Sequence, residues 1–289
     1  MRTLSFPGSD RSTSALAING LSLIQSNFGS PRLGNLELIA NESGRLVHYW
    51  CDDHPPHAWH GPFYFTDAQV SGNPALIQSR FGVRGHFELV SSAGGSAIRG
   101  LLHFRRNNDQ AVLPWQEPTV LATALTNVEA VALIESNFGD PGNLEAVVRV
   151  GEELFHLWFD GSRWSEPAYF FRGAAGAPGF IQSNYGKRGN FDVVTPLKAG
   201  GMAHLWRNND DQALPWAGPT TFGADLTERV DAVALIQNTM AAVGPGNLEL
   251  AARIGNRTCH FWRKPQPPFE PPPREWHGPS TFMCETGPR

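Results

Sequence analysis

Charged residues are scarce in this chain of 289 residues. Asp, Glu, Lys and Arg together make up 17% of it, against about 25% in an ordinary globular protein. The net charge is −4, so neither nucleic acid nor an anionic membrane is favoured as a partner. The three cysteines, Cys51, Cys259 and Cys284, are too few and odd in number for a disulfide framework.

Long apolar runs and targeting signals are also missing. No stretch approaches the roughly 18 consecutive apolar residues of a transmembrane helix, so no membrane insertion is expected. Residues 1–10 lack the basic and apolar segments of a signal peptide. We therefore expect a cytoplasmic protein, with non-classical secretion left open.

The sequence motifs of common active sites are absent as well. The chain has no Gly-x-Ser-x-Gly elbow, no Gly-x-Gly-x-x-Gly loop and no phosphate-binding lysine loop. It also lacks Cys-x-x-Cys, His-Glu-x-x-His and Asp-rich calcium-loop patterns. These absences give no support to a cofactor or a metal, and we expect neither.

Glycine, proline and aromatic residues are abundant instead. The chain has 30 Gly and 23 Pro, which predict many turns. Nine Trp, 18 Phe and a hydrophobic content of 41% are enough to bury a large core, so a disordered chain is excluded. The combination indicates a turn-rich all-β protein of short strands.

One short segment recurs five times along the chain. Leu-Ile-Gln-Ser-Asn-Phe-Gly begins at Leu23, and related segments begin at Leu76, Leu133 and Phe180, with a degraded copy at Leu235. The copies lie roughly 50 residues apart, a spacing typical of repeat architectures.

Three further landmarks follow the segment in every unit and keep the same order. A Gly-Asn-Leu-Glu box or its variant supplies a carboxylate, at Glu37, Glu88, Glu145, Asp192 and Glu249. A histidine within an apolar run comes next, at His48, His103, His156, His204 and His260. A tryptophan shortly before a proline closes the unit, at Trp59, Trp115, Trp164, Trp216 and Trp276.

Each unit is predicted to form four short strands, named a to d in chain order. Strand a is the recurrent segment, strand b follows the box, strand c carries the histidine and strand d is a Pro-aromatic run. Apolar and polar residues alternate with period two in b and c, and no long segment has the helical period. Four-stranded units repeating at this length are typical of a β-propeller.

We therefore predict an all-β fold, a five-bladed β-propeller of four-stranded blades, forming one domain over residues 1–289. The blades are expected at about 15–66, 74–122, 128–172, 177–223 and 231–283. Residues 1–14, which include Thr3–Phe6, are expected to supply a closing strand. A β-solenoid or a string of small sheets remains the alternative.

The carboxylate and the histidine keep a constant offset in units one, three and five. A hairpin turn at Asn41–Gly44 would place Glu37 directly opposite His48, on the same face of the sheet. We predict a hydrogen bond between the two side chains that braces each blade. The alternative is a ring of histidines around a metal on the propeller axis.

Alternating strand directions place the a–b and c–d connections on one face of the propeller. This face collects Asn, Asp, Arg and Trp, which suit a neutral sugar whose ring stacks on an aromatic plane. Units two and four carry the fullest sets, and we predict a glycan-binding site in each: Arg106, Asn107, Asn108, Asp109 and Trp115, and Arg207, Asn208, Asn209, Asp210 and Trp216. The alternative is that the Trp side chains pack between blades and the Asn side chains cap turns.

In its repeats and predicted architecture the chain resembles the tandem-repeat β-propeller lectins of fungi and bacteria, such as the tachylectin-like five-bladed proteins. Neither Ile-Gln-Ser-Asn-Phe-Gly nor Gly-Asn-Leu-Glu is a signature of those families. The resemblance implies a non-catalytic carbohydrate-binding protein with several repeat-related sites and with glycans or glycoconjugates as partners. A homo-oligomer is left open.

An enzyme with one active site in the central channel is the alternative function. It would be a hydrolase, a lyase or a metal enzyme built on the histidine ring. Its site would be lined by side chains from the ends of the first strands, at Gln25, Gln78, Glu135, Gln182 and Gln237.

Overall fold

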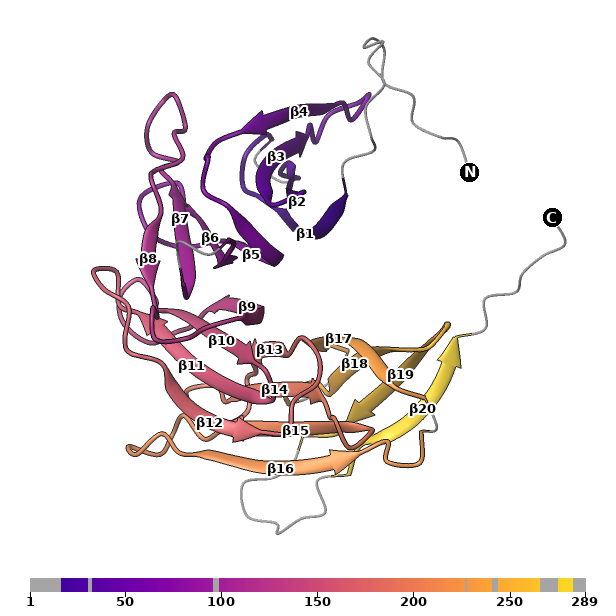
Figure 1. The fold of residues 1–289 in the computed structure, drawn as a ribbon. Helices are drawn as coiled ribbons and strands as arrows, with labels where there is room; N and C mark the ends of the chain where they lie inside the picture. The colour runs from indigo at the N-terminus through magenta and orange to yellow at the C-terminus, as the bar shows by residue number, and fades with distance from the viewer. Residues whose placement is uncertain are drawn as a thin grey trace, which may run out of the picture.

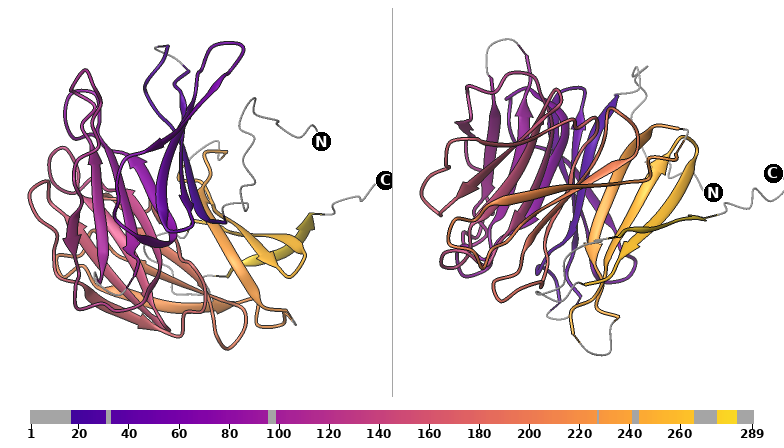
Figure 2. Two further views of the ribbon diagram at one scale, coloured as in Figure 1. Left: turned by 45° about the horizontal axis from the view of Figure 1, so that its top comes forward. Right: turned by 90° about the horizontal axis from the view of Figure 1, so that it is seen from below.

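The computed structural model describes residues 17–30, 33–95, 99–226, 228–240, 244–265 and 275–282, and every regular element in these ranges is a β-strand. The strands form five separate antiparallel sheets of four, each in simple meander order (Figure 1). Figure 2 shows these sheets standing side by side. The predicted five-bladed all-β propeller is confirmed. The predicted closing strand at 1–14 lies outside the described residues.

The blades follow one another along the chain. Blade one contains β1 (Ile18–Gln25), β2 (Leu36–Glu42), β3 (Arg45–Cys51) and β4 (Trp59–Tyr64). Blade two contains β5 (Val70–Gln78), β6 (Phe87–Ala93), β7 (Leu101–Arg106) and β8 (Thr119–Leu121). Blade three contains β9 (Val128–Glu135), β10 (Leu144–Val150), β11 (Glu153–Phe159) and β12 (Ala168–Arg172). Blade four contains β13 (Gly179–Gln182), β14 (Phe191–Pro196), β15 (Met202–Arg207) and β16 (Trp216–Phe222). Blade five contains β17 (Val230–Gln237), β18 (Leu248–Ile254), β19 (Arg257–Arg263) and β20 (His277–Phe282).

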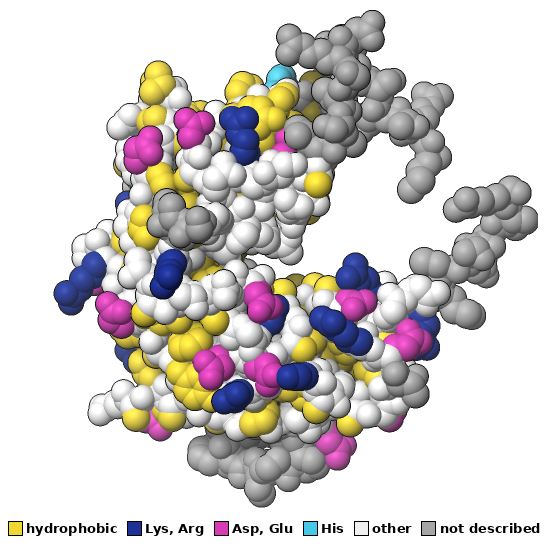
Figure 3. Space-filling model, in the orientation of Figure 1, with side chains coloured by type: hydrophobic (Ala, Val, Ile, Leu, Met, Phe, Trp, Pro, Cys, Tyr) yellow, Lys and Arg dark blue, Asp and Glu magenta, His cyan; other side chains and the backbone are white. Residues whose placement is uncertain are grey.

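The first strands of the blades line the centre of the ring. β1 lies beside β5, β5 beside β9, β9 beside β13 and β13 beside β17. β17 makes no comparable contact with β1 in the described chain, and the ring is open between blade one, drawn in indigo, and blade five, drawn in yellow (Figure 1). The space-filling view shows the same opening entering the ring (Figure 3).

The b–c hairpins are tighter than the sequence predicts. In blade one the turn consists of Ser43 and Gly44 alone, both with positive φ (52° and 90°), as a two-residue hairpin turn requires. Glu37 therefore pairs with Trp50, and His48 pairs with Ile39. The prediction that Glu37 lies directly opposite His48 is wrong. The turn has two residues where four were assumed, which shifts the partner of Glu37 by two positions and keeps the two side chains on one face.

The predicted hydrogen bond between histidine and carboxylate is nevertheless present in all five blades. The His Nε2 to carboxylate oxygen distances are 2.7 Å (His48–Glu37), 2.7 Å (His103–Glu88), 2.8 Å (His156–Glu145), 2.8 Å (His204–Asp192) and 2.6 Å (His260–Glu249). In blades one to four these side chains are at most 6% exposed. Each pair satisfies two polar groups that apolar neighbours surround.

A tryptophan from the next blade covers each buried pair. Ring centroids lie 5.9 Å apart for His48 and Trp115, 5.4 Å for His103 and Trp164, 5.6 Å for His156 and Trp216, and 5.5 Å for His204 and Trp276. All four contacts are edge-to-face, which is a favourable arrangement of aromatic rings. The repeated Trp therefore joins each blade to the one before it.

Replacing one histidine tests the structural role of the pair. We expect His156→Ala to lower the free energy of unfolding by about 1–3 kcal/mol, because Glu145 loses a donor while it stays buried. Chemical denaturation measures the change. Adding Glu145→Ala should cost less than the sum of the two single changes, and strict additivity would contradict the pairing.

The same histidine makes stability depend on pH. Burial lowers the pKa of His156 below its ordinary value, and the hydrogen bond to Glu145 offsets this only in part. Stability from this site is therefore fully present above the unfolded pKa of about 6.5 and is lost as pH falls through the lower folded value. We expect the free energy of unfolding to decrease below about pH 6.5, with a smaller slope in His156→Gln. An equal slope in both proteins would contradict this assignment.

Candidate functional site

The a–b and c–d loops meet on one face of the ring, as predicted. In blade two the Asp109 carboxylate accepts hydrogen bonds from the backbone N–H groups of Val83 (2.9 Å) and Arg84 (2.8 Å). These two donors lower the pKa of Asp109 below its ordinary value. Asp210 accepts equivalent bonds from Lys187 (2.8 Å) and Arg188 (2.9 Å). Both aspartates tie one loop to the other.

The arginine and second asparagine of each predicted site are buried. Arg106 donates through Nε to Asn108 Oδ1 (2.8 Å), and Asn108 Nδ2 donates to the Gly85 carbonyl (2.6 Å). The Arg106 guanidinium lies 3.8 Å above the Phe87 ring and 3.9 Å from Glu37 of blade one. Burial lowers the pKa of Arg106 to about 10, which leaves it charged at neutral pH.

Blade four repeats these contacts between an arginine and an asparagine. Arg207 donates through Nε to Asn209 Oδ1 (2.7 Å), and Asn209 Nδ2 donates to the Gly189 carbonyl (2.5 Å). The Arg207 guanidinium lies 4.0 Å from the centre of the Phe191 ring, and burial lowers its pKa to about 10. The same Arg–Asn and Asn–carbonyl hydrogen bonds therefore fix the loops of blades two and four.

The remaining predicted residues lie near these Arg–Asn pairs. Trp115 stacks on Phe65 of blade one at 4.4 Å, and Trp216 stacks on Phe170 of blade three at 4.2 Å. The side-chain oxygens of Asn107 and Asn208 accept from the backbone N–H groups of Asp109 and Asp210, at 3.1 Å each. The ten residues thus form two clusters in which the contacts serve packing and loop structure. Glycan binding by them stays a prediction.

The double change Asn108→Ala with Asn209→Ala separates the two roles. Because both amides are fully buried and bonded, we expect a loss of about 1–3 kcal/mol of stability at each site. Denaturation and glycan titration on the folded variant measure stability and affinity independently. A folded variant that keeps full glycan affinity would rule out the Asn108 and Asn209 amides as ligands for sugar.

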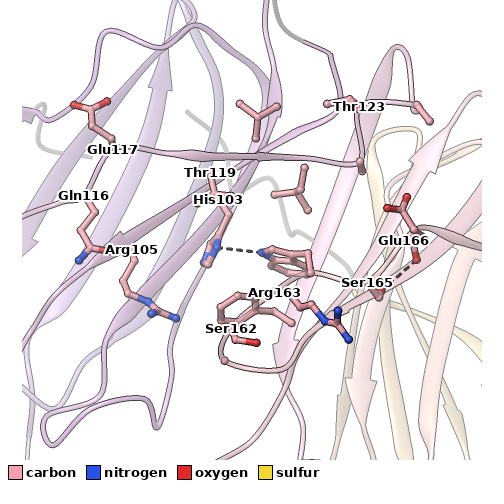
Figure 4. A pocket seen from close by; sticks show the side chains of 17 residues that line it. His103, Arg105, Gln116, Glu117, Thr119, Thr123, Ser162, Arg163, Ser165 and Glu166 are labelled. Carbon is pink, nitrogen blue, oxygen red and sulfur yellow. Dashed lines mark hydrogen bonds between the residues drawn. The ribbon is translucent and has the colours of Figure 1, made fainter.

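A cavity that the sequence did not reveal lies between blades two and three. It has a volume of about 600 Å³ and is bounded by β7, β8, residues 122–124 and the loop 160–166 (Figure 4). Trp164 and Phe159 provide aromatic surface, and Arg105 and Arg163 provide guanidinium groups. A volume of this size lies within the range of about 300–1,000 Å³ that small-molecule sites occupy.

The cavity exists because this interface departs from the repeat. In the other three interfaces a phenylalanine stacks flat on the tryptophan of the next blade, in the pairs Phe65–Trp115, Phe170–Trp216 and Phe222–Trp276. Blade two has Leu121 at the corresponding position, three residues after its strand-d proline. The shorter side chain leaves the face of Trp164 without a stacked ring, and the compact loop Asp160–Arg163 leaves the space open.

A second departure places a cation in the cavity. Blade two has Arg105 where the other blades have a tryptophan, two residues after the repeated histidine. Arg105 Nε donates to the buried Glu88 at 2.8 Å, while Nη2 has no hydrogen-bond partner within the described part of the protein. Such a buried unpaired donor is costly unless a ligand or water accepts from it.

The hydrogen bonds beneath the cavity define the state of its histidine. Trp164 Nε1 donates to His103 Nδ1 at 3.1 Å, as the dashed line in Figure 4 marks. The Nε2 of His103 lies 2.7 Å from Glu88, so a neutral imidazole with its proton on Nε2 satisfies both contacts. His103 therefore positions the Trp164 ring and has no free nitrogen for a ligand.

Polar side chains surround the mouth of the cavity on both blades. Blade two supplies Gln116, Glu117 and Thr119, and blade three supplies Ser162, Ser165 and Glu166 (Figure 4). The sequence signal for this site was the pair of exceptions at Arg105 and Leu121, which a search for shared residues passes over. A search for positions that break the repeat would have found both.

The inner ends of the first strands carry a different set of contacts. Gln78 bonds both the amide N–H and the side chain of Asn27, at 2.8 and 2.6 Å, and Gln182 bonds Asn137 in the same way. Between blades two and three a charged pair takes this place: Arg80 Nε lies 3.1 Å from Glu135. These residues, considered above for a channel active site, clasp neighbouring blades.

The described ranges contain no group of three or more His, Cys, Asp or Glu side chains arranged to hold a metal ion. No helix long and apolar enough to cross a membrane occurs in those ranges either.

Comparison with known proteins gives matches of fold. No protein-family profile matches the sequence, and no curated protein sequence does. The six-bladed β-propeller lectin of Aleuria aurantia, whose structure describes fucose recognition, superposes with a TM-score of 0.60 at 9% identity, over 93% of this chain and 79% of the lectin. AofleA from Arthrobotrys oligospora gives a TM-score of 0.58 at 10% identity, over 84% and 68% of the two chains.

Enzymes with this fold match as well. An ulvan lyase of a polysaccharide lyase family superposes with a TM-score of 0.52 at 14% identity, over 95% of this chain and 76% of the enzyme. At such identities the likeness concerns the fold alone. The predicted resemblance to fungal propeller lectins is confirmed at that level, and the matching folds include both carbohydrate-binding and carbohydrate-cleaving proteins.

Proposed function

We propose that this protein is a non-catalytic carbohydrate-binding protein whose principal site is the cavity between blades two and three. The observation that carries the proposal is that the half-buried Trp164 ring lines the cavity beside Arg105, at the interface where the Phe–Trp stack is missing. A repeat protein that leaves one interface unfilled loses packing energy there. A bound ligand would restore part of the packing that this interface lacks.

The chemistry of the cavity suits a saccharide. The face of Trp164 offers a plane for the C–H groups of a sugar ring. The Arg105 side chain, which is 23% exposed and lines the cavity, offers guanidinium donors to a hydroxyl or ring oxygen, and Glu117 and Glu166 at the mouth offer acceptors. A sugar presents donors and acceptors around an apolar ring face, so it can use both kinds of group at once.

The matching folds support this class of ligand without choosing between binding and cleavage. We favour binding because the buried carboxylate beneath the cavity is already committed: Glu88, which is 0% exposed, contacts His103, Arg105 and Ser79. A general acid or nucleophile needs a carboxylate free to reach the reacting bond. Glycans or glycoconjugates are the proposed partners.

Several parts of the wider proposal go with this site. The loop clusters at Arg106–Asp109 and Arg207–Asp210 remain proposed secondary sites, which would make the protein multivalent. A cytoplasmic location, with non-classical secretion open, and a homo-oligomeric state also remain predictions. Calorimetric stoichiometry distinguishes one working site per chain from several.

Leu121→Phe tests the cavity with the residue that three other interfaces use. We expect the new ring to stack on Trp164, cover the face that the glycan would use and abolish binding of the glycan identified on an array, while stability is unchanged or higher. Isothermal titration calorimetry measures affinity, and thermal unfolding reports on the fold. Product analysis after long incubation tests for turnover.

A matched control comes from another interface. Thr220→Val, on the strand d of blade four, should leave binding unchanged, since Thr220 corresponds to Thr119 of the cavity but lies in an interface with a complete Phe–Trp stack. Full affinity in a folded Leu121→Phe protein would exclude the cavity. Release of cleaved sugar by the unmodified protein would exclude the non-catalytic reading.

A further inference from the structure

Each of the four contacts between consecutive blades is built from two unlike halves. The earlier blade supplies isoleucine, histidine and usually phenylalanine, which are Ile24, His48 and Phe65 in blade one. The later blade supplies leucine or phenylalanine and a tryptophan, which are Leu76 and Trp115 in blade two. We name these the Ile–His–Phe side and the Leu–Trp side. Four apolar clusters of the described residues follow this scheme, one for each interface.

Blade five ends the row with an uncovered Ile–His–Phe side. Ile236 is 59% exposed and Phe282 is 57% exposed. The His260 side chain is 33% exposed, although it keeps its hydrogen bond to Glu249, whereas the other four repeated histidines are at most 6% exposed. Met240 is 85% exposed at the position where blade four has the half-buried Tyr185. All of these side chains lie on the side of blade five that a following blade would cover.

Blade one begins the row with the opposite half uncovered. Leu23 is 53% exposed and Trp59 is 42% exposed. The counterparts of Leu23 in blades two to five are 4–8% exposed: Leu76, Leu133, Phe180 and Leu235. Leu36 is 37% exposed, and its counterpart Phe87 is fully buried. The strand register places Leu23, Leu36 and Trp59 on the same face of the sheet. Exposed apolar side chains gathered on one face indicate an interaction surface.

Each Leu–Trp side packs on the preceding blade and each Ile–His–Phe side on the following one, so the two uncovered sides face the opening between blades one and five (Figure 1). One lacks a Leu–Trp partner and the other lacks an Ile–His–Phe partner, so a single blade with both sides would complete them together. One further blade is what a six-bladed ring would require, and the chain superposes on a six-bladed propeller with a TM-score of 0.60 over 79% of that protein.

From these features we infer that the opening is a docking site for a sixth four-stranded blade of the same repeat chemistry. Its Leu–Trp side packs on Ile236, His260 and Phe282 of blade five. Its Ile–His–Phe side packs on Leu23 and Trp59 of blade one. The partner is therefore a propeller-type blade with a tryptophan over one face and a histidine–carboxylate pair at the other.

The inner clasp predicts an asymmetry in this docking. Gln25 of blade one is exposed and corresponds to Gln78, which clasps the asparagine of the preceding blade. An asparagine on the docked blade would meet Gln25 in the same way. Blade five has Thr239 where the asparagine would be, so the contact on that side rests on apolar packing alone.

The test appends a copy of blade four, residues 175–226, to the C-terminus of the full chain through a flexible linker. Blade four is suitable because Phe180, Trp216, His204 and Phe222 supply both sides, and Asn184 supplies the clasp. Cysteine introduced by Leu23→Cys or Ile236→Cys reports whether each side is covered. We expect alkylation of both cysteines to slow by roughly tenfold or more in the extended chain, and its Tm to rise.

A matched extension carries Trp216→Ala and Ile181→Asp in the appended copy only. It has the same length and should give neither protection nor a higher Tm, which separates docking from a tether effect. Protection in both extended proteins, or in neither, would overturn the proposal.

The double variant Leu23→Cys with Ile236→Cys, without any extension, tests the other occupants. We expect no disulfide within the chain and none between chains under mild oxidation. An intramolecular disulfide would mean that blade one closes directly on blade five, and an intermolecular one would mean that a second copy fills the opening. Either result would overturn the sixth-blade assignment.

Discussion

A carboxylate buried between sheets is the constraint on which this propeller depends. Glu37, Glu88, Glu145 and Asp192 lie out of water, where an ion without donors would be prohibitively costly. The histidine of the same blade supplies a donor, and the tryptophan of the next blade covers the pair. One polar requirement within a blade thus fixes the apolar surface that the following blade must present. The order of the blades around the ring follows from that link.

The strand content and blade number were predictable because they depend on local pattern. Alternation with period two and five ordered landmarks needed no knowledge of distant contacts. The register of the b–c hairpin was harder, since Asn41–Gly44 contains turn-forming residues at each position. The choice of Ser43 and Gly44 depends on their positive φ and on strand twist, which the sequence pattern alone does not rank. Because the register differs by two positions, Glu37 and His48 still lie on the same face of the sheet and form the predicted hydrogen bond.

The candidate sites illustrate a different limit. Arg, Asn, Asp and Trp in the loops of blades two and four have the chemistry of sugar recognition, yet burial decides which partners they meet. Arg106 and Asn108 bond each other inside the interface, where the Phe87 ring covers the guanidinium. The cavity beside Arg105 has the opposite origin. It lies where Leu121 replaces the phenylalanine of the other blades. A missing ring at one position of a repeat is not a sequence motif, so a motif search does not reveal it.

The intact repeat and the proposed binding site therefore lie in different places in this molecule. Where the repeat is kept, its histidines bond the carboxylates of the same blade and its glutamines bond asparagines of the preceding blade. Where it is broken, at Arg105 and Leu121, a donor and an aromatic face are left over. The opening follows the same rule on a larger scale, since the first and last blades keep interface residues that no blade covers. In a ring built from similar units, interface side chains that no neighbouring blade covers point to a partner.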